Sequence, residues 1–434
     1  MVKNVRRLLP VVFLAGLALW STSTAWNEPV NWSSDALFYQ AHTLMLRGES
    51  EQTALRTTLT GEPGRQVRLT AAGNLHELAQ LRDPRWIAYN EQITRRRVLV
   101  PALAAAVYPL FGLWSLQAVS LAGYLAFGLL LYALLRRRFQ PGASTIVVSV
   151  CLLLPAMRLW SQHPLTDSWG VALETACLLA GLLVLDRGVR WLPLWVVAIA
   201  ALSLTRDATV VVVAGAAWVA VRERTPRSIL LTLTGAAAAL PAPLAFGNPL
   251  GNAVGNAVGN FQSGYWPSLQ TMLRQDLYVN TIGSQQRLTG LVLLGGIALL
   301  LVRPQTEAVA SARRLASIAC LAYVVFNLLS MAFFFSGLYV PVGLIFISGL
   351  ALLFAPLRPV DPSLRLFRGA AVACAGYLAL YPTASGFRLE LVFLPLVAVG
   401  AARAVARWGI APKREGARRP QLERQLEPQS VPPL

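Results

Sequence analysis

Residues 113–135 read LWSLQAVSLAGYLAFGLLLYALL and are followed directly by three arginines, Arg136 to Arg138. The stretch carries no charged side chain, and about 20 apolar residues are enough for a helix to cross the hydrocarbon core of a bilayer. Basic residues beside a transmembrane helix favour the cytoplasmic side. The stretch therefore predicts a membrane-spanning helix that ends in the cytoplasm.

The composition of the whole chain agrees with this prediction. Of its 434 residues, 55% are hydrophobic and only 13% are charged, and the mean hydropathy is +0.53. Soluble globular proteins carry about 25% charged residues. This composition excludes a soluble enzyme, a disordered protein and a secreted disulfide scaffold, and it predicts an all-α polytopic membrane protein.

Other apolar stretches bring the expected number of transmembrane helices to about twelve. A cleaved signal peptide is the alternative for the first, because Ser23-Thr24-Ala25 resembles a cleavage site. We favour a retained span, since many more follow. The predicted spans are residues 8–25, 113–135, 143–159, 169–185, 191–205, 208–221, 229–246, 288–302, 315–335, 338–357, 369–383 and 389–405.

The chain divides at its two hydrophilic interruptions and at its polar tail, which is rich in Pro, Arg, Gln and Glu and is expected to be disordered. The predicted segments are a first transmembrane helix (1–25), an outer loop with interfacial helices (26–112), a helical module (113–246), a second outer loop (247–287), C-terminal transmembrane helices (288–405) and a cytoplasmic tail (406–434).

Two helices are expected in the first outer loop. Ser33 or Ser34 can cap a helix that has Asp35 in its first turn, and the apolar spacing that follows predicts an amphipathic helix on the bilayer surface. Residues 98–112 are apolar but short, and prolines interrupt them. We expect this stretch to be interfacial or re-entrant, because a crossing here would place Arg136 to Arg138 outside.

With this topology most lysines and arginines fall on one side of the membrane, together with both termini. The net charge of +18 is then explained by membrane orientation and by attraction to anionic membrane lipid, so no nucleic acid partner is expected. We predict a multi-pass protein of the bacterial inner membrane whose active site lies on the outer face.

Several polar residues near that outer face are candidates for function. Asp35 follows the first span, and Asp167 precedes the fourth, where a helix cap is the simpler interpretation. Glu174 lies two helical turns after Asp167 on the same face, inside a span, where an acid is a functional candidate by default; a structural pair with an arginine is the alternative. Arg206 and Asp207 form a short outer turn, and a local ion pair would explain them equally well.

The sequence indicates two further candidates less strongly. His163 stands in the same outer loop as Asp167 but has no spaced partner that would indicate a metal site. Arg388 opens the last span, where it either reaches the interface as a snorkelling side chain or binds a lipid phosphate through its guanidinium.

The order of several short motifs resembles the GT-C superfamily of membrane glycosyltransferases, which includes the protein O-mannosyltransferases and the lipid A aminoarabinose transferases. The resemblance covers residues 1–220 and the end of the bundle. The motifs are Asp35 after the first span, Arg97-Val98-Leu99-Val100-Pro101 leading to Leu110-Phe111-Gly112, Leu134-Leu135-Arg136-Arg137-Arg138-Phe139, Pro155 with Leu165-Thr166-Asp167, Leu204-Thr205-Arg206, and the stretch from Gly386 through Arg388 to Pro395. The chain departs from the family in two places: many relatives have an acidic pair where Asp35 stands alone, and many have lysine in place of Arg206.

The resemblance implies an inverting glycosyltransferase that moves a sugar from a polyprenyl-phosphate donor to an acceptor in the cell envelope, which is a glycolipid, a polysaccharide or a protein. Asp35 would be the general base for the acceptor hydroxyl. The departing phosphate needs charge stabilisation, which Arg388, Arg206 and Arg97 would supply. Asp167, Glu174 and His163 would orient the acceptor or the sugar, or hold a divalent cation, for which the spacing is not diagnostic.

A transporter or a flippase for lipid-linked sugars is the alternative function. Transporters often show inverted repeats and broken helices near the membrane midplane. The two halves of this sequence show no such repeat, and the acids gather at the outer edge. A non-catalytic scaffold is a third class. We therefore predict an enzyme.

Overall fold

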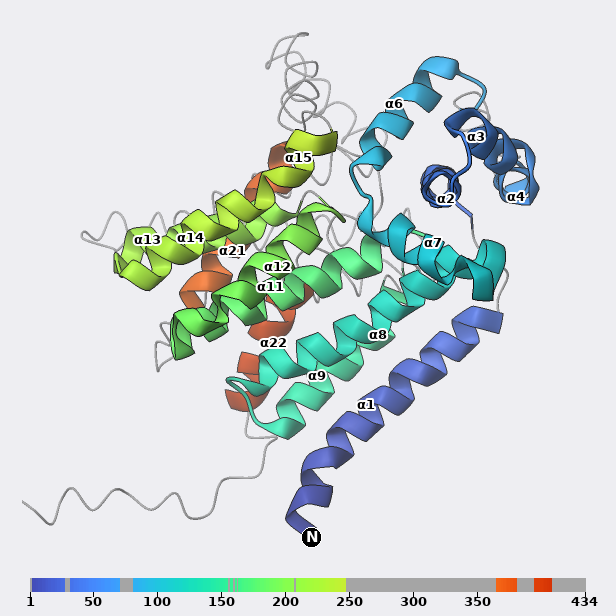
Figure 1. The fold of residues 1–434 in the computed structure, drawn as a ribbon. Helices are drawn as coiled ribbons and strands as arrows, with labels where there is room; N and C mark the ends of the chain where they lie inside the picture. Colours follow the sequence, from blue (N-terminus) through green and yellow to red (C-terminus); the bar gives the residue numbers. More distant parts are fainter. Residues whose placement is uncertain are drawn as a thin grey trace, which may run out of the picture.

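The computed structural model describes residues 2–27, 32–70, 81–154, 157–158, 161, 163–206, 208–246, 364–380 and 394–407. In these residues all regular secondary structure is helical, which confirms the predicted all-α class (Figure 1). The helices are α1 (Val2–Asn27), α2 (Ser34–Leu46), α3 (Glu51–Thr60), α4 (Glu62–Thr70), α6 (Pro84–Arg95), α7 (Leu99–Phe111), η2 (Gly112–Trp114), α8 (Ser115–Arg136), α9 (Pro141–Leu153), α11 (Asp167–Arg187), η3 (Val189–Trp191), α12 (Leu192–Ser203), α13 (Thr209–Glu223), α14 (Pro226–Ala239), α15 (Pro241–Phe246), α21 (Leu364–Leu380) and α22 (Leu394–Arg407).

Two stretches are long and apolar enough to cross a membrane, judged by length and composition. One is Asp167–Arg187, and the other is Leu99–Arg136, which includes α7, η2 and α8. Gly112 interrupts the second stretch with φ of +55°, and α7 packs back against α8 (Figure 1). Other apolar helices in the described part are shorter, so the number of spans stays a prediction.

Prolines end or divide two predicted spans earlier than expected. α9 stops at Leu153, because Leu154 precedes Pro155 and a residue before proline is disfavoured in the helical conformation. The predicted span 229–246 is divided into α14 and α15 at Pro241. The predicted spans between residues 288 and 357 lie outside the described residues.

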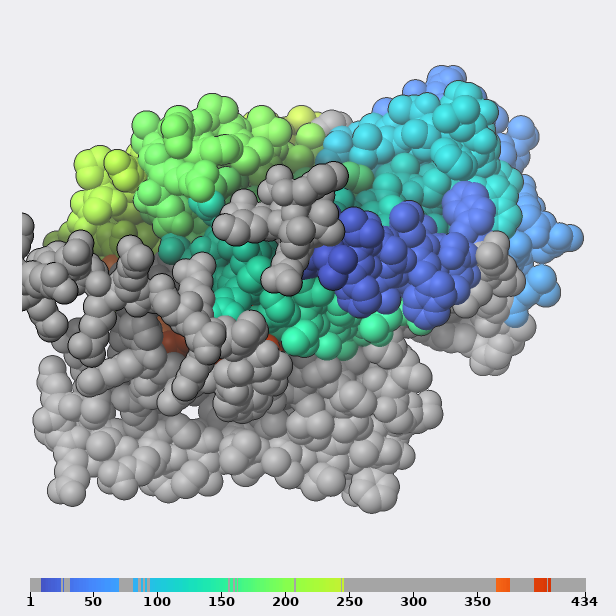
Figure 2. Space-filling view, turned by 90° about the horizontal axis from the view of Figure 1, so that it is seen from below, coloured from blue at the N-terminus to red at the C-terminus, as the bar shows by residue number. Residues whose placement is uncertain are grey.

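The molecule has two parts in the described chain (Figure 1). Helices α2, α3, α4, α6 and α7 form what we call the N-terminal layer, which gathers at one end of a bundle made by α1, α8, α9, α11–α14, α21 and α22. The bundle has one large apolar core, and a smaller cluster joins Ala36 and Leu37 of the layer to Leu116 of α8. Figure 2 shows α1 in dark blue along the outside of the bundle, beside α8 and α9.

The outer surface of the bundle is apolar. Large hydrophobic side chains that face outward include Phe13 and Trp20 on α1, Val150 on α9, Val197 on α12 and Leu233 on α14. Helices at the surface of a soluble protein instead place polar residues outside, and large exposed apolar areas mark contact with a membrane or a partner. This surface is compatible with a lipid environment around the bundle.

The bundle end opposite the N-terminal layer carries much of the basic charge. Arg138 after α8 forms an ion pair of 2.6 Å with Asp186 near the end of α11. Arg365 at the start of α21 pairs with Glu223 at the end of α13 at 2.9 Å. We call this the basic end. The loop pattern predicts that these arginines lie on one side of the membrane, and the two ion pairs join helix ends there in pairs.

Helix α2 differs from its prediction in one respect. Ser33 caps it as expected, accepting a hydrogen bond from the amide of Ala36 at 3.4 Å. The expectation of an amphipathic helix on the bilayer surface is wrong, because every residue from Ala36 to Leu44 is buried, including Gln40. Neighbouring α3, α6 and α7 cover it. The sequence pattern does not show this because the three covering helices are short and α3 and α6 are rich in polar residues.

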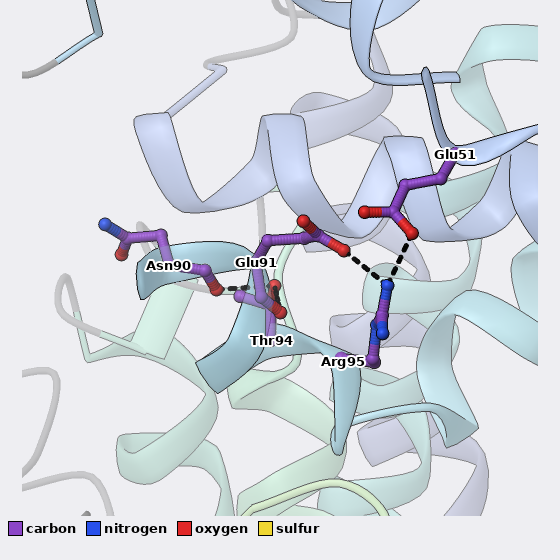
Figure 3. A network of polar contacts seen from close by, with 5 residues as sticks. All are labelled: Glu51, Asn90, Glu91, Thr94 and Arg95. Carbon is purple, nitrogen blue, oxygen red and sulfur yellow. Dashed lines mark hydrogen bonds and ion pairs between the residues drawn. The ribbon is translucent and has the colours of Figure 1, made fainter. Parts of the chain in front are cut away.

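A polar network joins α3 to α6 beside α2 (Figure 3). The Arg95 guanidinium donates to Glu51 and to Glu91, each at 2.7 Å. Burial and a hydrogen bond with Glu51 raise the pKa of Glu91. Arg95 thus neutralises two acids that would otherwise repel each other, and it joins α3 to α6.

His42 makes the stability of this layer dependent on pH. Burial, followed by the charge of Arg95, lowers the pKa of His42 from 6.5 to about 4, while Glu51 acts in the opposite direction. An unfolded chain therefore binds a proton between pH 6.5 and 4 that the folded chain does not bind, so His42 costs about 3 kcal/mol of stability as the pH falls through this window. Glu91 acts in the opposite sense, because its raised pKa stabilises the folded state at low pH.

We expect His42→Gln to remove the part of the acid destabilisation that falls between pH 6.5 and 4. The measurement is the unfolding midpoint of detergent-solubilised protein at several pH values, compared with wild type. The two proteins should diverge at pH 5 and converge at pH 7. An unchanged pH dependence in the variant would contradict the role of His42.

Candidate functional site at the junction of layer and bundle

Four segments that are far apart in sequence meet where the N-terminal layer rests on the bundle. They are the start of α2, the turn between α6 and α7, the start of α11, and the turn between α12 and α13. The predicted candidates Asp35, Arg97, Asp167 and Arg206 come one from each of these segments. We call this region the junction site.

Asp35 lies in the first turn of α2, two residues after the capping residue Ser33. A carboxylate there is favoured by the unpaired backbone amides and by the helix dipole. Asp35 is neither fully buried nor fully exposed. Since Tyr39 follows it by one helical turn, the two side chains share one side of α2.

Tyr39 links the layer to the bundle. Its side chain is fully buried, and its hydroxyl accepts a hydrogen bond from Arg97 at 2.8 Å and one from Thr166 at 3.5 Å. Thr166 is the residue before Asp167. The hydroxyl of Tyr39 thus ties the predicted phosphate-binding Arg97 to the start of α11.

A backbone contact holds the other side of the junction site. The amide of Leu99 donates to the carbonyl of Leu204 at 3.1 Å, which fixes the start of α7 against the turn after α12. Arg97 and Arg206 each lie two residues from this bond. The bond brings together the backbones of two arginine-bearing turns that are separated by about a hundred residues.

Side-chain hydrogen bonds between α11 and α8 fix the position of Asp167. Ser168 donates to the carbonyl of Ser120 at 2.7 Å, and Trp169 donates to the carbonyl of Val119 at 2.7 Å. Ser120 in turn donates to the carbonyl of Leu165 at 2.8 Å. Side-chain hydrogen bonds of this kind join helices in membrane bundles, where small residues allow close approach. The start of α11 is therefore held rigidly against α8.

Asp167 and Arg206 form a buried ion pair, with Asp167 Oδ1 on Arg206 Nη1. The side chain of Asp167 is 0% exposed and that of Arg206 is 8% exposed. Asp167 is the first residue of α11 but does not cap it; the cap position is Thr166. The alternative of a simple helix cap is therefore wrong. Asp207 lies outside the described residues, so its pairing with Arg206 stays open.

Gly170 makes room for this ion pair. A Cβ atom at Gly170 would lie 2.7 Å from Cδ of Arg206 and 3.1 Å from its Cγ. Real side chains do not approach so closely, so the inner part of the Arg206 side chain would have to shift. Glycine at this position is required by the path of the arginine.

We therefore expect Gly170→Ala to destabilise the protein by about 1–3 kcal/mol through overpacking and displacement of Arg206. Gly142→Ala is the matched control, because a Cβ atom there meets nothing within 4 Å. The measurement is the free energy of unfolding in detergent. Equal free energies of unfolding for the two variants would show that the position of the Arg206 side chain does not require the space at Gly170.

Glu174 lies two turns deeper in α11, facing into the bundle. It is fully buried, and neither carboxylate oxygen has a hydrogen-bond partner in the described part of the chain. Arg206 is the cation whose charge acts on it. The predicted arrangement of Asp167 and Glu174 on one helix face is compatible with this, because the same arginine influences both.

The remaining candidate residues, His163 and Arg388, are not among the four that define the junction site. His163 is 7% exposed and precedes the start of α11, where its carbonyl accepts from the amide of Leu165 at 2.7 Å. Arg388 lies outside the described residues, so its role stays a prediction. Among the residues described, no group of three or more His, Cys, Asp or Glu side chains is arranged to hold a metal ion.

Two residues of the junction site were missed by the sequence analysis. Tyr39 and Thr166 have no charge and belong to no motif with a chemical signature. The available signals were Tyr39 one turn after Asp35 and Thr166 directly before Asp167. Neither signal shows that the two hydroxyls meet across 127 residues of sequence.

Neither a scan against protein-family models nor a search of curated proteins finds a match to this chain.

Proposed function

We propose that the chain is a polytopic membrane glycosyltransferase, which transfers a sugar from a polyprenyl-phosphate donor to an acceptor on the extracytoplasmic side. The observation that carries the proposal is the junction site: a partly accessible carboxylate, Asp35, lies in the same layer as Arg97, and this layer meets the bundle at the turn that carries Arg206. A carboxylate and guanidinium groups at one end of a helical bundle are the groups this reaction requires.

The distribution of basic residues and the apolar outer surface of the bundle support a location in a membrane. The basic end would face the cytoplasm, since Arg and Lys are enriched there in membrane proteins. The N-terminal layer would then lie on the outer side. The apolar outer surface of the bundle would be in contact with lipid, which supports a location in a membrane; the bacterial inner membrane follows from the resemblance to the GT-C superfamily alone.

Cysteine labelling tests this orientation. In a variant that lacks the four native cysteines, we expect Gln140→Cys, at the basic end, to react with a membrane-impermeant maleimide only from the cytoplasmic side. Asp83→Cys, in the N-terminal layer, should react only from outside. Labelling of both positions from one side would contradict the proposed topology.

The chemistry follows from the charges of the site. The acceptor hydroxyl must lose a proton as it attacks the anomeric carbon, and Asp35 would take this proton as general base. The departing polyprenyl phosphate carries negative charge and needs cations rather than a strong acid. Arg97, with Arg388, would supply them. One attacking hydroxyl and one leaving phosphate invert the anomeric carbon in a single displacement, for which no glycosyl-enzyme intermediate is needed.

Arg206 would not make the direct phosphate contact that the resemblance implies. Its guanidinium is already bound to Asp167, and both side chains are buried. We infer a positioning role, in which the pair holds the turn between α12 and α13 and, through Leu204, the start of α7 beside Arg97. Asp167, Glu174 and His163 would then help to hold these two segments in position. A divalent cation would bind there only if the substrate supplied further ligands.

The cell envelope tests the proposal without knowledge of the substrate. A strain that lacks the protein should lose one sugar modification from its glycolipids, polysaccharides or glycoproteins, as measured by mass spectrometry. Complementation with the wild-type gene should restore the modification, and the Asp35→Asn variant should not. An unchanged set of envelope glycans would contradict the proposal.

Glu174 favours a second candidate, a transporter or lipid flippase. Its buried carboxylate has no hydrogen bond to any residue that the structure describes, and acids inside an apolar helix are typical of ion and substrate pathways in membranes. The two functions differ in their products. An enzyme releases polyprenyl phosphate from a polyprenyl-phosphate sugar, whereas a flippase moves the intact lipid to the other leaflet.

A further inference from the structure

Arg158 differs from the other arginines near the junction site. It lies in the connection between α9 and α11, where its amide donates to the carbonyl of Leu154 at 3.0 Å. Arg95, Arg97 and Arg206 each bind a carboxylate or a tyrosine hydroxyl. Arg158 has no ion-pair partner among the residues that the structure describes, and its Nε atom is buried without a hydrogen-bond acceptor there.

The surroundings of Arg158 are hydroxyl groups and an aromatic ring of α1. Its Nη2 donates a hydrogen bond to the hydroxyl of Thr24 at 3.4 Å, and the Thr24 hydroxyl in turn donates one to the carbonyl of Ser21 at 2.8 Å. The ring of Trp20 lies with its centroid 5.9 Å from Cζ of Arg158, within reach of a cation–π contact. These contacts position the guanidinium but supply no negative charge.

The side of the bundle on which Arg158 lies faces outward along α1. Trp20 is 54% exposed, and Leu19 and Phe13 on the same helix are also exposed. Thr24 is close to the end of α1 that leads into the N-terminal layer, so Arg158 lies at the same end of the bundle as the junction site. An arginine is costly in an apolar environment unless an anion compensates it.

We propose that Arg158 binds the phosphate of a membrane lipid whose acyl or prenyl chain lies along the outer surface of α1. A guanidinium fits phosphate oxygens through two parallel hydrogen bonds, one of which would satisfy the buried Nε atom. The hydroxyl of Thr24 and the ring of Trp20 border the headgroup. The inference rests on the membrane location within the proposed function but not on sugar transfer.

Lipid binding to purified full-length protein tests the proposal. Native mass spectrometry with added phosphatidylglycerol or undecaprenyl phosphate gives an apparent dissociation constant for each lipid. Loss of a charge-assisted hydrogen-bond pair should weaken binding to Arg158→Gln by about 10- to 100-fold. Arg158→Lys keeps the charge but not the planar fork, so its affinity should lie between those of wild type and Arg158→Gln.

Arg222→Gln is the matched control, because Arg222 also lies over a tryptophan ring, that of Trp218 at 4.9 Å, but near the basic end. This variant should bind both lipids as wild type does. A preference for undecaprenyl phosphate would identify the lipid as the donor carrier, and equal affinities would identify a general lipid phosphate; both results support the site.

Three results would overturn the proposal. The first is unchanged affinity of Arg158→Gln for both lipids. The second is wild-type affinity of Arg158→Lys, which decides the matter if the glutamine variant does not fold. The third is full competition by inorganic phosphate at the concentration of the lipid, since a lipid site must gain affinity from the chain. Because the readout is lipid binding, absence of glycosyltransferase activity leaves the result interpretable.

Discussion

Replacement of Asp35 by asparagine is expected to reduce sugar transfer by about 10²- to 10⁴-fold, the range that a positioned general base contributes. The substitution keeps the size of the side chain and its place in the first turn of α2 but removes the group that accepts the proton. The measurement is the rate of transfer of labelled sugar from polyprenyl phosphate, with the amount of folded protein in the membrane determined in parallel.

Asp83→Asn is the control for this experiment. Asp83 is a second aspartate of the N-terminal layer, just before α6, and is exposed and outside the junction site. Its variant should transfer sugar at the wild-type rate. If Asp35→Asn retains normal turnover, the carboxylate of Asp35 has no part in the chemistry.

The largest effect on stability is expected from Asp167→Asn, which should cost about 3–5 kcal/mol. Asparagine cannot neutralise the guanidinium of Arg206, whose side chain is only 8% exposed. The variant leaves this charge in an apolar environment without its counter-ion. The free energy of unfolding in detergent, measured by chemical denaturation, gives the cost directly.

A double variant separates the cost of an unpaired charge from the loss of a contact. Asp167→Leu combined with Arg206→Met replaces the ion pair by apolar side chains of similar size, a change that is often neutral or stabilising. The double variant should therefore recover most of the stability that Asp167→Asn loses. A double variant as unstable as the single one would show that the region needs the ion pair itself.

The helices were largely predictable because the apolar stretches are long. α8 and α11 match their predicted spans within a few residues, since the turns that flank them are marked by arginine, glycine or proline. The errors come from local chemistry and packing. Pro155 and Pro241 ended helices inside apolar stretches, and the complete burial of α2 depends on partners that are distant in sequence.

The candidate site was predictable as a set of residues but not as an arrangement. Charged residues in an apolar chain stand out, so Asp35, Asp167, Glu174 and Arg206 could be selected from the sequence. Their pairing could not, because the buried contact between Asp167 and Arg206 depends on the space left by Gly170. The hydroxyls of Tyr39 and Thr166 carry no signal that distinguishes them from ordinary core residues.

The most direct test of the account is the incubation of purified protein in liposomes with a polyprenyl-phosphate sugar and an extract of envelope acceptors. The account predicts the release of free polyprenyl phosphate together with the appearance of sugar on an acceptor, and the loss of both with Asp35→Asn. Movement of the intact lipid between leaflets without the release of polyprenyl phosphate would contradict it.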